Sequence, residues 1–335
     1  MIKCLVTGGC GFIGSNLVHA LLDKGWQVDV VDDLSNGHIE FLEDLDVRTV
    51  HVDLLHMFEK KYESSLVSPV LLITGDFAHS NVLSRIKQKH YTYVFHLAAQ
   101  PRVETSVDEP VMTSETNLFK ALALFDACRD SIKRLIFSSS SSIFGDALKF
   151  PTDEGHIKNP QSPYALQKYC CEMFATMFYK LYGLDTVSLR YFNVYGPRQY
   201  GDSPYATAIA AWCNAIKKNQ PLRSDGDGTQ CRDLVYVDDV VSANILAATA
   251  TSTISGMSFN IGHGQSYSNN EILKMFKDRF SNIRITTSPW RSGDVMKTCA
   301  DVELAHKLLS YKSKMSIEEG LMRTLSWWGI GEKDA

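Results

Sequence analysis

The sequence predicts an α/β protein in which a doubly wound parallel sheet, residues 1–191, is followed by a smaller α/β lobe, residues 192–335, with part of the chain crossing back. Three observations carry this prediction. Short apolar, β-rich runs alternate with helical patterns in the first half, a glycine-rich turn follows the first run, and loops dominate after about residue 191. With 335 residues and 44% hydrophobic content, the chain can bury a large core.

Six apolar runs bounded by turn residues are the expected strands. They span residues 2–7, 28–31, 70–74, 93–97, 135–138 and 186–190. Apolar residues at helical spacing predict helices over 14–24, 81–89, 111–129 and 164–182. Residues 38–69 follow neither pattern, and we expect an insertion packed at the edge of the sheet. After residue 191, loop-rich stretches such as YGPRQYGDSPY and SDGDGTQ alternate with shorter elements.

Charge and cysteine content exclude several classes of function. The net charge is −4 and Lys and Arg are dispersed, so the basic patch of a nucleic-acid-binding protein is missing. No apolar run reaches the ~18 residues of a membrane span, and no charged and apolar segments of a secretion signal follow Met1. The eight cysteines show no metal-ligand spacing. We therefore expect a reduced, cytoplasmic protein that binds small molecules, with no metal, nucleic acid or membrane.

The stretch CLVTGGCGFIGSNL places Gly8, Gly11 and Gly14 where the first strand passes into the first helix. Such a turn directs backbone N–H groups and the positive end of the helix dipole at one point, and glycine lets a pyrophosphate reach the backbone. Tight packing of strand against helix is the alternative. Asp32 and Asp33 end the next strand, where a carboxylate accepts hydrogen bonds from a ribose diol and repels a 2′-phosphate. This favours NAD over NADP, unless the two acids are only turn residues.

A second stretch, SPYALQKYCCEMF, places Tyr164 and Lys168 four residues apart and therefore on one helical face. An ammonium near the phenol, helped by the positive nicotinamide of bound NAD, lowers the pKa of the tyrosine towards neutrality. Upstream, RLIFSSSSSIFGD runs from a strand into the five serines Ser138 to Ser142. These hydroxyls indicate a polar pocket at the carboxyl end of the sheet, with a serine-rich turn as the alternative.

In this order and spacing, the glycine turn, strand-end aspartate, serine cluster and Tyr-x-x-x-Lys resemble the extended short-chain dehydrogenase/reductases. More narrowly, they are similar to the NAD-dependent nucleotide-sugar epimerases. The resemblance continues through VFHLAAQ, LRYFNVYGPRQ, GDGTQCRDLVYVDDVVSA, FNIGHG and RSGDVMKTCADVELA. It implies a Rossmann fold, NAD as cofactor and epimerisation of a UDP-sugar at C4 through a 4-keto sugar. It also implies a homodimer formed by the helices over 111–129 and 164–182.

The resemblance assigns roles residue by residue. Tyr164 would be the acid and base, Lys168 would orient the nicotinamide ribose, Ser140 would hydrogen-bond the sugar's 4-oxygen, and Ser142 would support it. The other implied contacts with NAD are Gly8, Gly11, Phe12, Ile13, Gly14, Asp32, Asp33, Ser35, Asn36, Gly37, Asp76, Phe77, Leu97, Ala98, Ala99 and Asn117, with Asp76 and Phe77 against the adenine. The implied substrate contacts are Ser140, Ser141, Asn193, Gln199, Tyr205, Arg232, Arg291, Asp294 and Thr298.

In this resemblance Asn193, Arg232 and Arg291 would hold the diphosphate, to which an arginine pairs in a bidentate manner. Surface ion pairs of Arg232 with Asp233 and of Arg291 with Asp294 are the alternative. Two departures, Pro101 and Asp225, separate the chain from many galactose 4-epimerases and leave uridine as an expectation.

Other departures bear on the sugar. Sugar 4,6-dehydratases carry Thr-Asp-Glu at positions 140–142, and UDP-glucuronate decarboxylases carry a glutamate at 142, whereas this chain has serines. Asn193 and Tyr200 replace the Thr and Arg typical of glucuronate 4-epimerases. The small Thr298 would border the sugar's C2 substituent and leave room for an N-acetyl group, so we expect UDP-GlcNAc and UDP-GalNAc to react beside UDP-Glc and UDP-Gal. The alternative for Thr298 is that it only packs under its loop. The alternatives for the protein are a UDP-glucuronate 4-epimerase, a net dehydrogenase or reductase, and a non-catalytic NAD-sensing protein.

Overall fold

The computed structural model describes residues 2–57, 69–202, 207–251, 253–280, 282–289 and 295–331. The chain divides into two compact units, each made of three segments. Unit 1 comprises Met1–Ser140, Ser162–Arg190 and Val241–Phe259, and unit 2 comprises Ser141–Gln161, Tyr191–Val240 and Asn260–Ala335. The boundary that the sequence suggests after residue 191 lies beside the division at Arg190, but residues 141–161 and 241–259 each belong to the unit on its other side.

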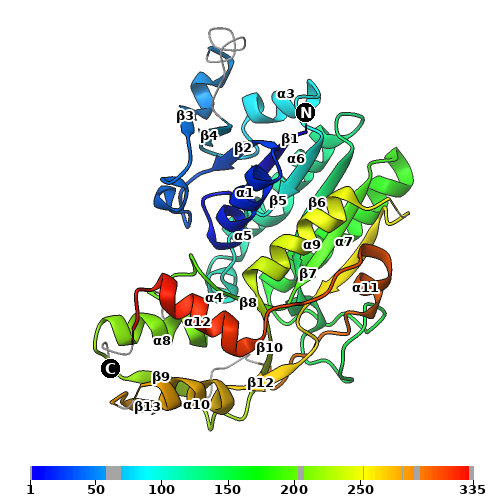
Figure 1. Ribbon diagram of the computed structural model, residues 1–335. Coiled ribbons are helices and arrows are strands. Elements are labelled where there is room, and N and C mark those ends of the chain that lie inside the picture. Colours follow the sequence, from blue (N-terminus) through cyan, green and yellow to red (C-terminus); the bar gives the residue numbers. More distant parts are fainter. Residues whose placement is uncertain are drawn as a thin grey trace. The chain divides into compact units, whose positions relative to one another are not determined.

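Unit 1 is organised around a sheet of eight strands, shown in Figure 1. The strands are β1 Lys3–Thr7, β2 Gln27–Asp32, β3 Val47–His51, β4 Val70–Thr74, β5 Tyr93–His96, β6 Arg134–Ser140, β7 Thr186–Tyr191 and β11 Met257–Ile261. Their order is β11-β7-β6-β5-β1-β2-β4-β3, and the pairings from β3 to β6 are parallel. The predicted doubly wound fold is confirmed, with its switch point between β1 and β5, where ligands bind in such sheets.

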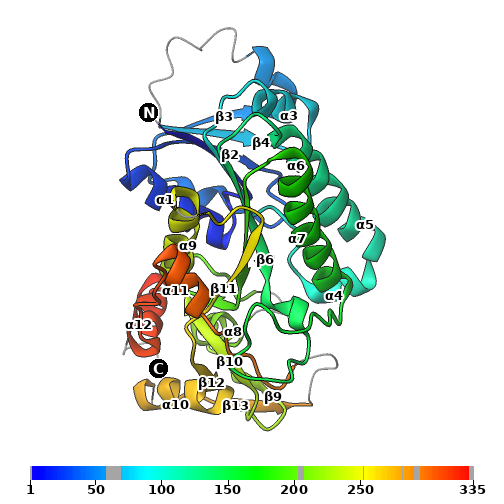
Figure 2. The same cartoon turned by 90° about the vertical axis from the view of Figure 1, so that its right-hand side faces the viewer.

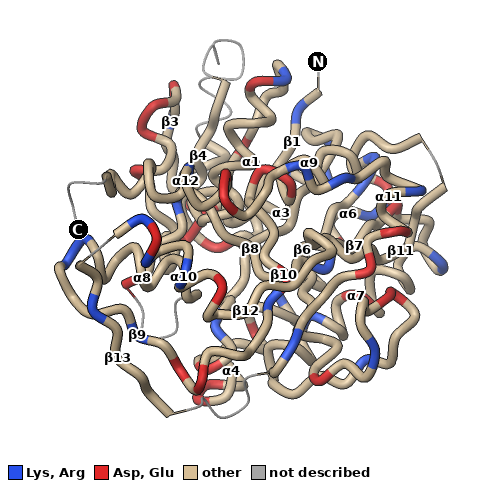
Figure 3. The backbone as a smooth tube through the Cα atoms, turned by 60° about the horizontal axis from the view of Figure 1, so that its bottom comes forward, with Lys and Arg blue, Asp and Glu red and all other residues tan. Residues whose placement is uncertain are grey.

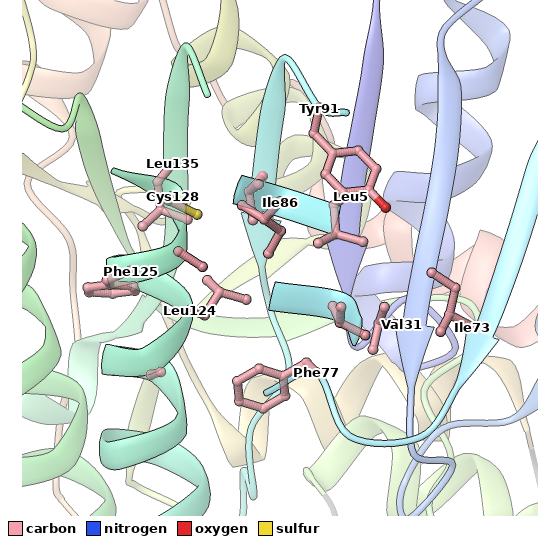
Figure 4. Packing of buried hydrophobic residues seen from close by; sticks show 14 of the residues in the cluster. Leu5, Val31, Ile73, Phe77, Ile86, Tyr91, Leu124, Phe125, Cys128 and Leu135 are labelled. Carbon is pink, nitrogen blue, oxygen red and sulfur yellow. The ribbon is translucent and has the colours of Figure 1, made fainter. Parts of the chain in front are cut away.

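Helices cover both faces of this sheet (Figure 2). Helices α1 Phe12–Asp23 and α9 Val237–Thr249 lie on one face, and α3 Ser80–Lys87, α6 Ala121–Cys128 and α7 Pro163–Tyr182 lie on the other. Strand residues such as Leu5 and Ile73 pack against Ile86 of α3 and Phe125 of α6 in one buried cluster, seen in Figure 4. This apolar layer fixes the carboxyl ends of β1, β5 and β6 as a rigid edge.

Two strands and one helix differ from the sequence prediction. Strand β3 lies within the segment 38–69 and pairs with β4 at the edge of the sheet, together with the short helical turns η1 Ile39–Leu42 and η2 Val52–Leu54. Strand β11 joins the opposite edge from far along the chain, which a local pattern cannot reveal. The helix predicted over 111–129 is divided into α5 Pro110–Ser114, a π-helical turn η3 Glu115–Lys120 and α6, after a short α4 Val103–Asp108.

Unit 2 contains two small sheets and short helices. Strands β12 Ser266–Ser268, β10 Cys231–Tyr236 and β8 Asn193–Tyr195 form one sheet, and β13 Ile285–Ser288 pairs with β9 Leu222–Asp225 in the other. Its helices are η4 Ser141–Phe144, α8 Ala208–Lys217, α10 Asn269–Arg279, α11 Glu303–Leu309 and α12 Ile317–Trp327. Trp212 of α8 and Phe276 of α10 pack edge to face at 5.4 Å and are fully buried, so unit 2 has a core of its own.

Basic and acidic residues alternate along the backbone rather than collecting in one basic stretch (Figure 3). All eight cysteines are free thiols. Within the described ranges, no helix is long and apolar enough to cross a membrane. The same ranges contain no group of three His, Cys, Asp or Glu side chains arranged to hold a metal ion.

Candidate active site

The turn between β1 and α1 shows what each glycine is for. Gly8 adopts a φ of +72°, and a Cβ there would lie 2.8 Å from the backbone N of Ala98. A Cβ at Gly14 would overlap the carbonyl oxygen of Gly8. The fold itself therefore requires these two glycines, which is the packing role that the sequence left open for them.

Gly11 is different, because a Cβ there would meet one described atom, the Gly8 oxygen at 3.2 Å. It caps α1 without a side-chain hydrogen bond, and the first-turn N–H groups of Phe12 and Ile13 have no partner within a helix. At the helix N-terminus, a Cβ on Gly11 thus has a single described atom within 4 Å. This geometry fits a pyrophosphate, which accepts hydrogen bonds from such N–H groups.

The carboxylate of Asp32 connects the β1–α1 turn to the loop after β2. Its oxygens accept the backbone N–H groups of Cys10 and Leu34, both at 2.9 Å. The side chain is 6% exposed, and burial raises its pKa. A Cβ at Gly37 would lie 2.6 Å from Asp32 Oδ1, so the chain passes tightly over the carboxylate. Each oxygen keeps a second lone pair, which a ribose hydroxyl can use.

Beside it, Asp33, Ser35 and Asn36 are exposed. Asp33 Oδ1 accepts hydrogen bonds from the backbone N–H and the hydroxyl of Ser35. Asn36 donates to the side chain of Gln100 at 3.2 Å. Gln100 was not among the residues expected from the sequence, and it joins the loop after β2 to the loop after β5.

Asn117 holds that second loop in place. Its amide accepts from Gln100 N at 2.7 Å and donates to Gln100 O at 3.0 Å and to Gln167 Oε1 at 2.8 Å. The side chain is buried, and it lies in the π-helical turn that interrupts the predicted helix. Asn117 therefore positions the loop that contains Leu97, Ala98 and Ala99. Its amide makes these hydrogen bonds to other residues of the chain.

The pair expected near the adenine consists of a half-buried acid, Asp76, and a core residue, Phe77. Asp76 Oδ2 lies 2.6 Å from Lys120 Nζ, and Asp76 Oδ1 accepts from Ala78 N. Phe77 is 6% exposed and belongs to the cluster of Figure 4, and its ring centroid lies 4.9 Å from that of His96. Phe77 therefore contributes its ring to the core of unit 1.

Tyr164, Lys168 and Ser140 come together in unit 1. Helix α7 begins at the cap of Ser162, and its first turn carries Tyr164. Lys168, one turn further, is 3% exposed, and its Nζ lies 5.8 Å from the Tyr164 ring and donates to Ser138 O at 2.8 Å. The Ser140 side chain is hydrogen-bonded to the phenol. The end of β6 and the first turns of α7 thus hold a phenol, a hydroxyl and an ammonium together.

The electrostatics of this trio show what the chain's own groups contribute to the tyrosine pKa. Burial raises the pKa of Tyr164 to about 12, and the Ser140 hydrogen bond opposes that shift. Burial also lowers the pKa of Lys168 to about 8, against the opposing charges of Cys171 and Glu172. The chain's own groups therefore do not bring the tyrosine towards neutrality. A positive charge beside the phenol, such as an oxidised nicotinamide, is what would favour the phenolate.

A buried ion pair that the sequence did not reveal supports the trio. Arg190 of β7 donates to Glu172 of α7 through Nε and Nη2, the latter at 2.8 Å, and both side chains are about 5% exposed or less. The Ser139 hydroxyl donates to the same carboxylate. Because Ser139 stands between the serine that binds Lys168 and the serine that binds Tyr164, this cluster fixes the end of β6 against α7.

Unit 2 brings together Asn193, Thr298 and the neighbours of Arg232. Asp233 is fully buried and accepts the backbone N–H groups of His263, Gly264 and Ala300. Burial raises the pKa of this carboxyl to about 6. The Thr298 hydroxyl accepts from Asp233 N at 3.0 Å and donates to Asn193 Oδ1 at 3.2 Å.

The other expected substrate residues of unit 2 either make hydrogen bonds within the chain or lie outside the described ranges. Arg232 Nη1 donates to the carbonyl of Cys231. The Gln199 side chain donates a hydrogen bond to Val194 O and accepts one from the Thr207 hydroxyl. Ser141 and Ser142 open the turn η4. Tyr205, Arg291 and Asp294 lie outside the described residues.

A glycine turn opening into a helix at the switch point of a parallel sheet, with a phenol, a serine and a lysine at the end of β6 and the start of α7, defines a dinucleotide-dependent enzyme of the Rossmann class. The chain matches the model of the NAD dependent epimerase/dehydratase family over residues 4–262 and belongs to that family. It is an enzyme that uses NAD, and the resemblance found in the sequence is confirmed.

Relatives cover the chain almost end to end. A UDP-glucose 4-epimerase of Mycolicibacterium smegmatis is 31% identical over 332 residues, covering 98% of each chain. A UDP-glucose 4-epimerase of Thermotoga maritima, solved with UDP-glucose, is 36% identical with a TM-score of 0.86 and covers 98% of this chain and 99% of its own. A UDP-N-acetylglucosamine 4-epimerase of Methanobrevibacter ruminantium M1, solved with UDP-N-acetylmuramic acid, is 35% identical with a TM-score of 0.85 and 98% coverage of each chain.

Proposed function

We propose that this enzyme interconverts the C4 epimers of a UDP-sugar, with UDP-GlcNAc and UDP-GalNAc as one pair and UDP-Glc and UDP-Gal as another. The observation that carries the proposal is the Tyr164 phenol hydrogen-bonded to Ser140, with the buried Lys168 ammonium 5.8 Å from its ring. The epimerases similar to this chain act on UDP-sugars both with and without an N-acetyl group, which supports both pairs.

The chain's own groups handle the proton of the sugar's 4-hydroxyl. Tyr164 takes that proton as a base and returns it as an acid, while the Ser140 hydroxyl keeps the phenol and the 4-oxygen in one hydrogen-bonded line. Lys168 stabilises the phenolate form, and its own position is fixed by Ser138 O. NAD, when bound, supplies the acceptor and the donor of the hydrogen at C4.

The serines argue against elimination of water. Positions 140, 141 and 142 carry hydroxyl groups and no carboxyl. A serine can accept or donate a hydrogen bond, but it is a poor acid for expelling a hydroxide from carbon. We therefore favour epimerisation over dehydration within this family.

The test is to incubate the NAD-loaded enzyme with UDP-GlcNAc, UDP-Glc and UDP-glucuronate separately and to follow the anomeric protons by NMR. We expect the first two to reach equilibrium with their C4 epimers without accumulation of NADH. Steady growth of NADH absorbance would instead show a net dehydrogenase, and no turnover of any sugar would favour an NAD-sensing protein.

Tyr164→Phe ties the activity to the site. Removing the phenol hydroxyl should lower kcat by about 10²–10⁴-fold, the usual contribution of general acid–base catalysis, and should leave the melting temperature unchanged. Tyr179→Phe is the matched control, because Tyr179 lies on the same helix and is 36% exposed. Equal activity of the two variants would remove Tyr164 from the mechanism.

We also propose a homodimer that works in the cytoplasm. Exposed apolar side chains collect on η3 and α7, among them Phe119, Met173 and Leu181 at 60%, 56% and 63% exposure. Eight free thiols suit a reducing compartment. Light scattering should give twice the mass of 37.5 kDa, and Met173→Asp should give the monomer.

A further inference from the structure

Thr298 is held from both sides by backbone hydrogen bonds. Its N–H donates to Cys231 O at 3.1 Å, and its carbonyl accepts the Ser266 hydroxyl at 2.5 Å. Both partners belong to the sheet of β10 and β12. The side chain of Thr298 therefore has a fixed origin, and its behaviour is decided by what its hydroxyl contacts.

The hydroxyl has a defined direction. Its oxygen accepts the backbone N–H of Asp233 at 3.0 Å, and its proton points to Asn193 Oδ1 at 3.2 Å. Asp233 cannot shift to follow a ligand, because three backbone N–H groups hold its carboxylate. Asn193 is the first residue of β8, and Leu234 of the neighbouring strand β10 lies opposite it in the sheet. The hydroxyl thus bridges β10 and β8 at one point.

This bridge orients the Asn193 amide. With Oδ1 turned towards the Thr298 hydroxyl, the NH₂ group lies on the other side of the amide and is the donor that the side chain offers to a ligand. A diphosphate can only accept hydrogen bonds, so it requires the NH₂ and is repelled by the carbonyl oxygen. Asn193 is half-buried, which leaves the amide within reach of a ligand.

We propose that Thr298 is a positioning residue that keeps the NH₂ of Asn193 directed at the diphosphate of the nucleotide sugar. The proposal rests on the proposed function, since the diphosphate belongs to that substrate. This role is distinct from the expected one, in which the size of Thr298 selects the C2 substituent of the sugar. The role depends on the hydroxyl, whereas selection by size depends on volume.

The experiment measures binding of UDP, which has the diphosphate and no sugar, by calorimetry. Thr298→Val keeps the size and removes the hydroxyl, and we expect about a tenfold weaker Kd, equal to about 1.4 kcal/mol. Thr298→Ser keeps the hydroxyl and should stay within about threefold of the wild type, because the bridge to Asn193 is retained. Thr286→Val, at an exposed threonine of β13 in the same unit, is the matched control and should bind as the wild type does.

A double-mutant cycle separates positioning from a structural role. In an Asn193→Ala background, Thr298→Val should change the Kd for UDP less than twofold. In the otherwise wild-type chain, Thr298→Val should lower kcat by a smaller factor than it raises KM. Thr298→Ala is a second variant without the hydroxyl, should the valine protein not fold. Equal UDP affinity of wild type and Thr298→Val, or a Thr298→Ser variant that changes only the preference between UDP-GlcNAc and UDP-Glc, would overturn the positioning role. Absence of UDP binding by the wild type would contradict the proposed function itself.

Discussion

The β1–α1 turn of unit 1 and the bridge from Asp233 through Thr298 to Asn193 in unit 2 are both proposed to face a diphosphate, and they are built differently. In the turn, backbone N–H groups face the ligand and glycines shape the path of the chain. In unit 2, a side-chain amide faces it, oriented by a hydroxyl. The first is set by steric exclusion and the second by the direction of hydrogen bonds. The two regions should therefore respond differently to substitution.

The largest effect is expected in the turn. Gly14→Ala places a Cβ on the Gly8 oxygen, so the turn must open, with a loss of about 1–3 kcal/mol of stability and of NAD binding by more than about 100-fold. Gly11→Ala should cost under about 1 kcal/mol, because its Cβ meets only a 3.2 Å contact and the cap loses only glycine's advantage. It should still weaken NAD binding about tenfold or more.

Thermal unfolding and NAD titration of the two variants check this difference. If Gly11→Ala were as unstable as Gly14→Ala, Gly11 would serve the fold rather than the ligand. If Gly11→Ala bound NAD as tightly as the wild type, the pyrophosphate would not lie against Gly11 at the N-terminus of α1.

A smaller effect is expected at Asp233. Asp233→Asn turns one acceptor into an NH₂ that faces backbone N–H groups, which costs about 1–3 kcal/mol. The pKa of Asp233 is about 6 in the folded chain and near 3.8 when unfolded, so its stabilising contribution is complete below pH 4 and is lost as the pH rises through 6. The cost of the substitution should therefore be about 1 kcal/mol larger at pH 5 than at pH 7. Urea unfolding at both pH values measures this, and a cost that grew with pH would contradict the assignment.

The smallest effect is a pH dependence in the catalytic trio. The pKa of Lys168 is lowered to about 8, so the ammonium loses its charge as the pH rises through that value. Turnover should fall several-fold between about pH 7 and pH 9, since the phenolate loses its positive neighbour. Lys168→Arg, which stays charged, should be slower at pH 7 but should not show this decline. A decline of the same size in both proteins would assign it to another group.

The contrast between the two regions also explains what the sequence could predict. Gly8 and Gly14 stand out in the sequence because a Cβ at either position would clash with backbone atoms, so that a side chain is excluded there. The alternation of apolar runs predicted six of the eight strands because each is a continuous buried segment. Strand β11 and the bond from Thr298 to Asn193 join residues far apart in the chain, and no local pattern encodes such pairs.

Within the site, the sequence identified groups but not their electrostatic state. Tyr164 and Lys168 were recognised from their spacing, whereas the opposing effects of burial and of the Ser140 hydrogen bond on the tyrosine pKa depend on packing that spacing does not show. The ion pair of Glu172 and Arg190 was missed because its partners lie on different elements. Asn117 and Phe77 are expected at the cofactor, and the structure adds that the Asn117 amide binds Gln167 and that the Phe77 ring packs in the core.

In the proposed reaction, one enzyme-bound NAD takes the hydride from C4 of a UDP-sugar and returns it to the other face, without net oxidation. The most direct measurement is conversion of UDP-GlcNAc carrying deuterium at C4, followed by mass spectrometry of the product and by NADH absorbance. We predict that the deuterium is retained at C4 of UDP-GalNAc and that no NADH accumulates. Deuterium lost to water, or recovered in released NADH, would contradict the account.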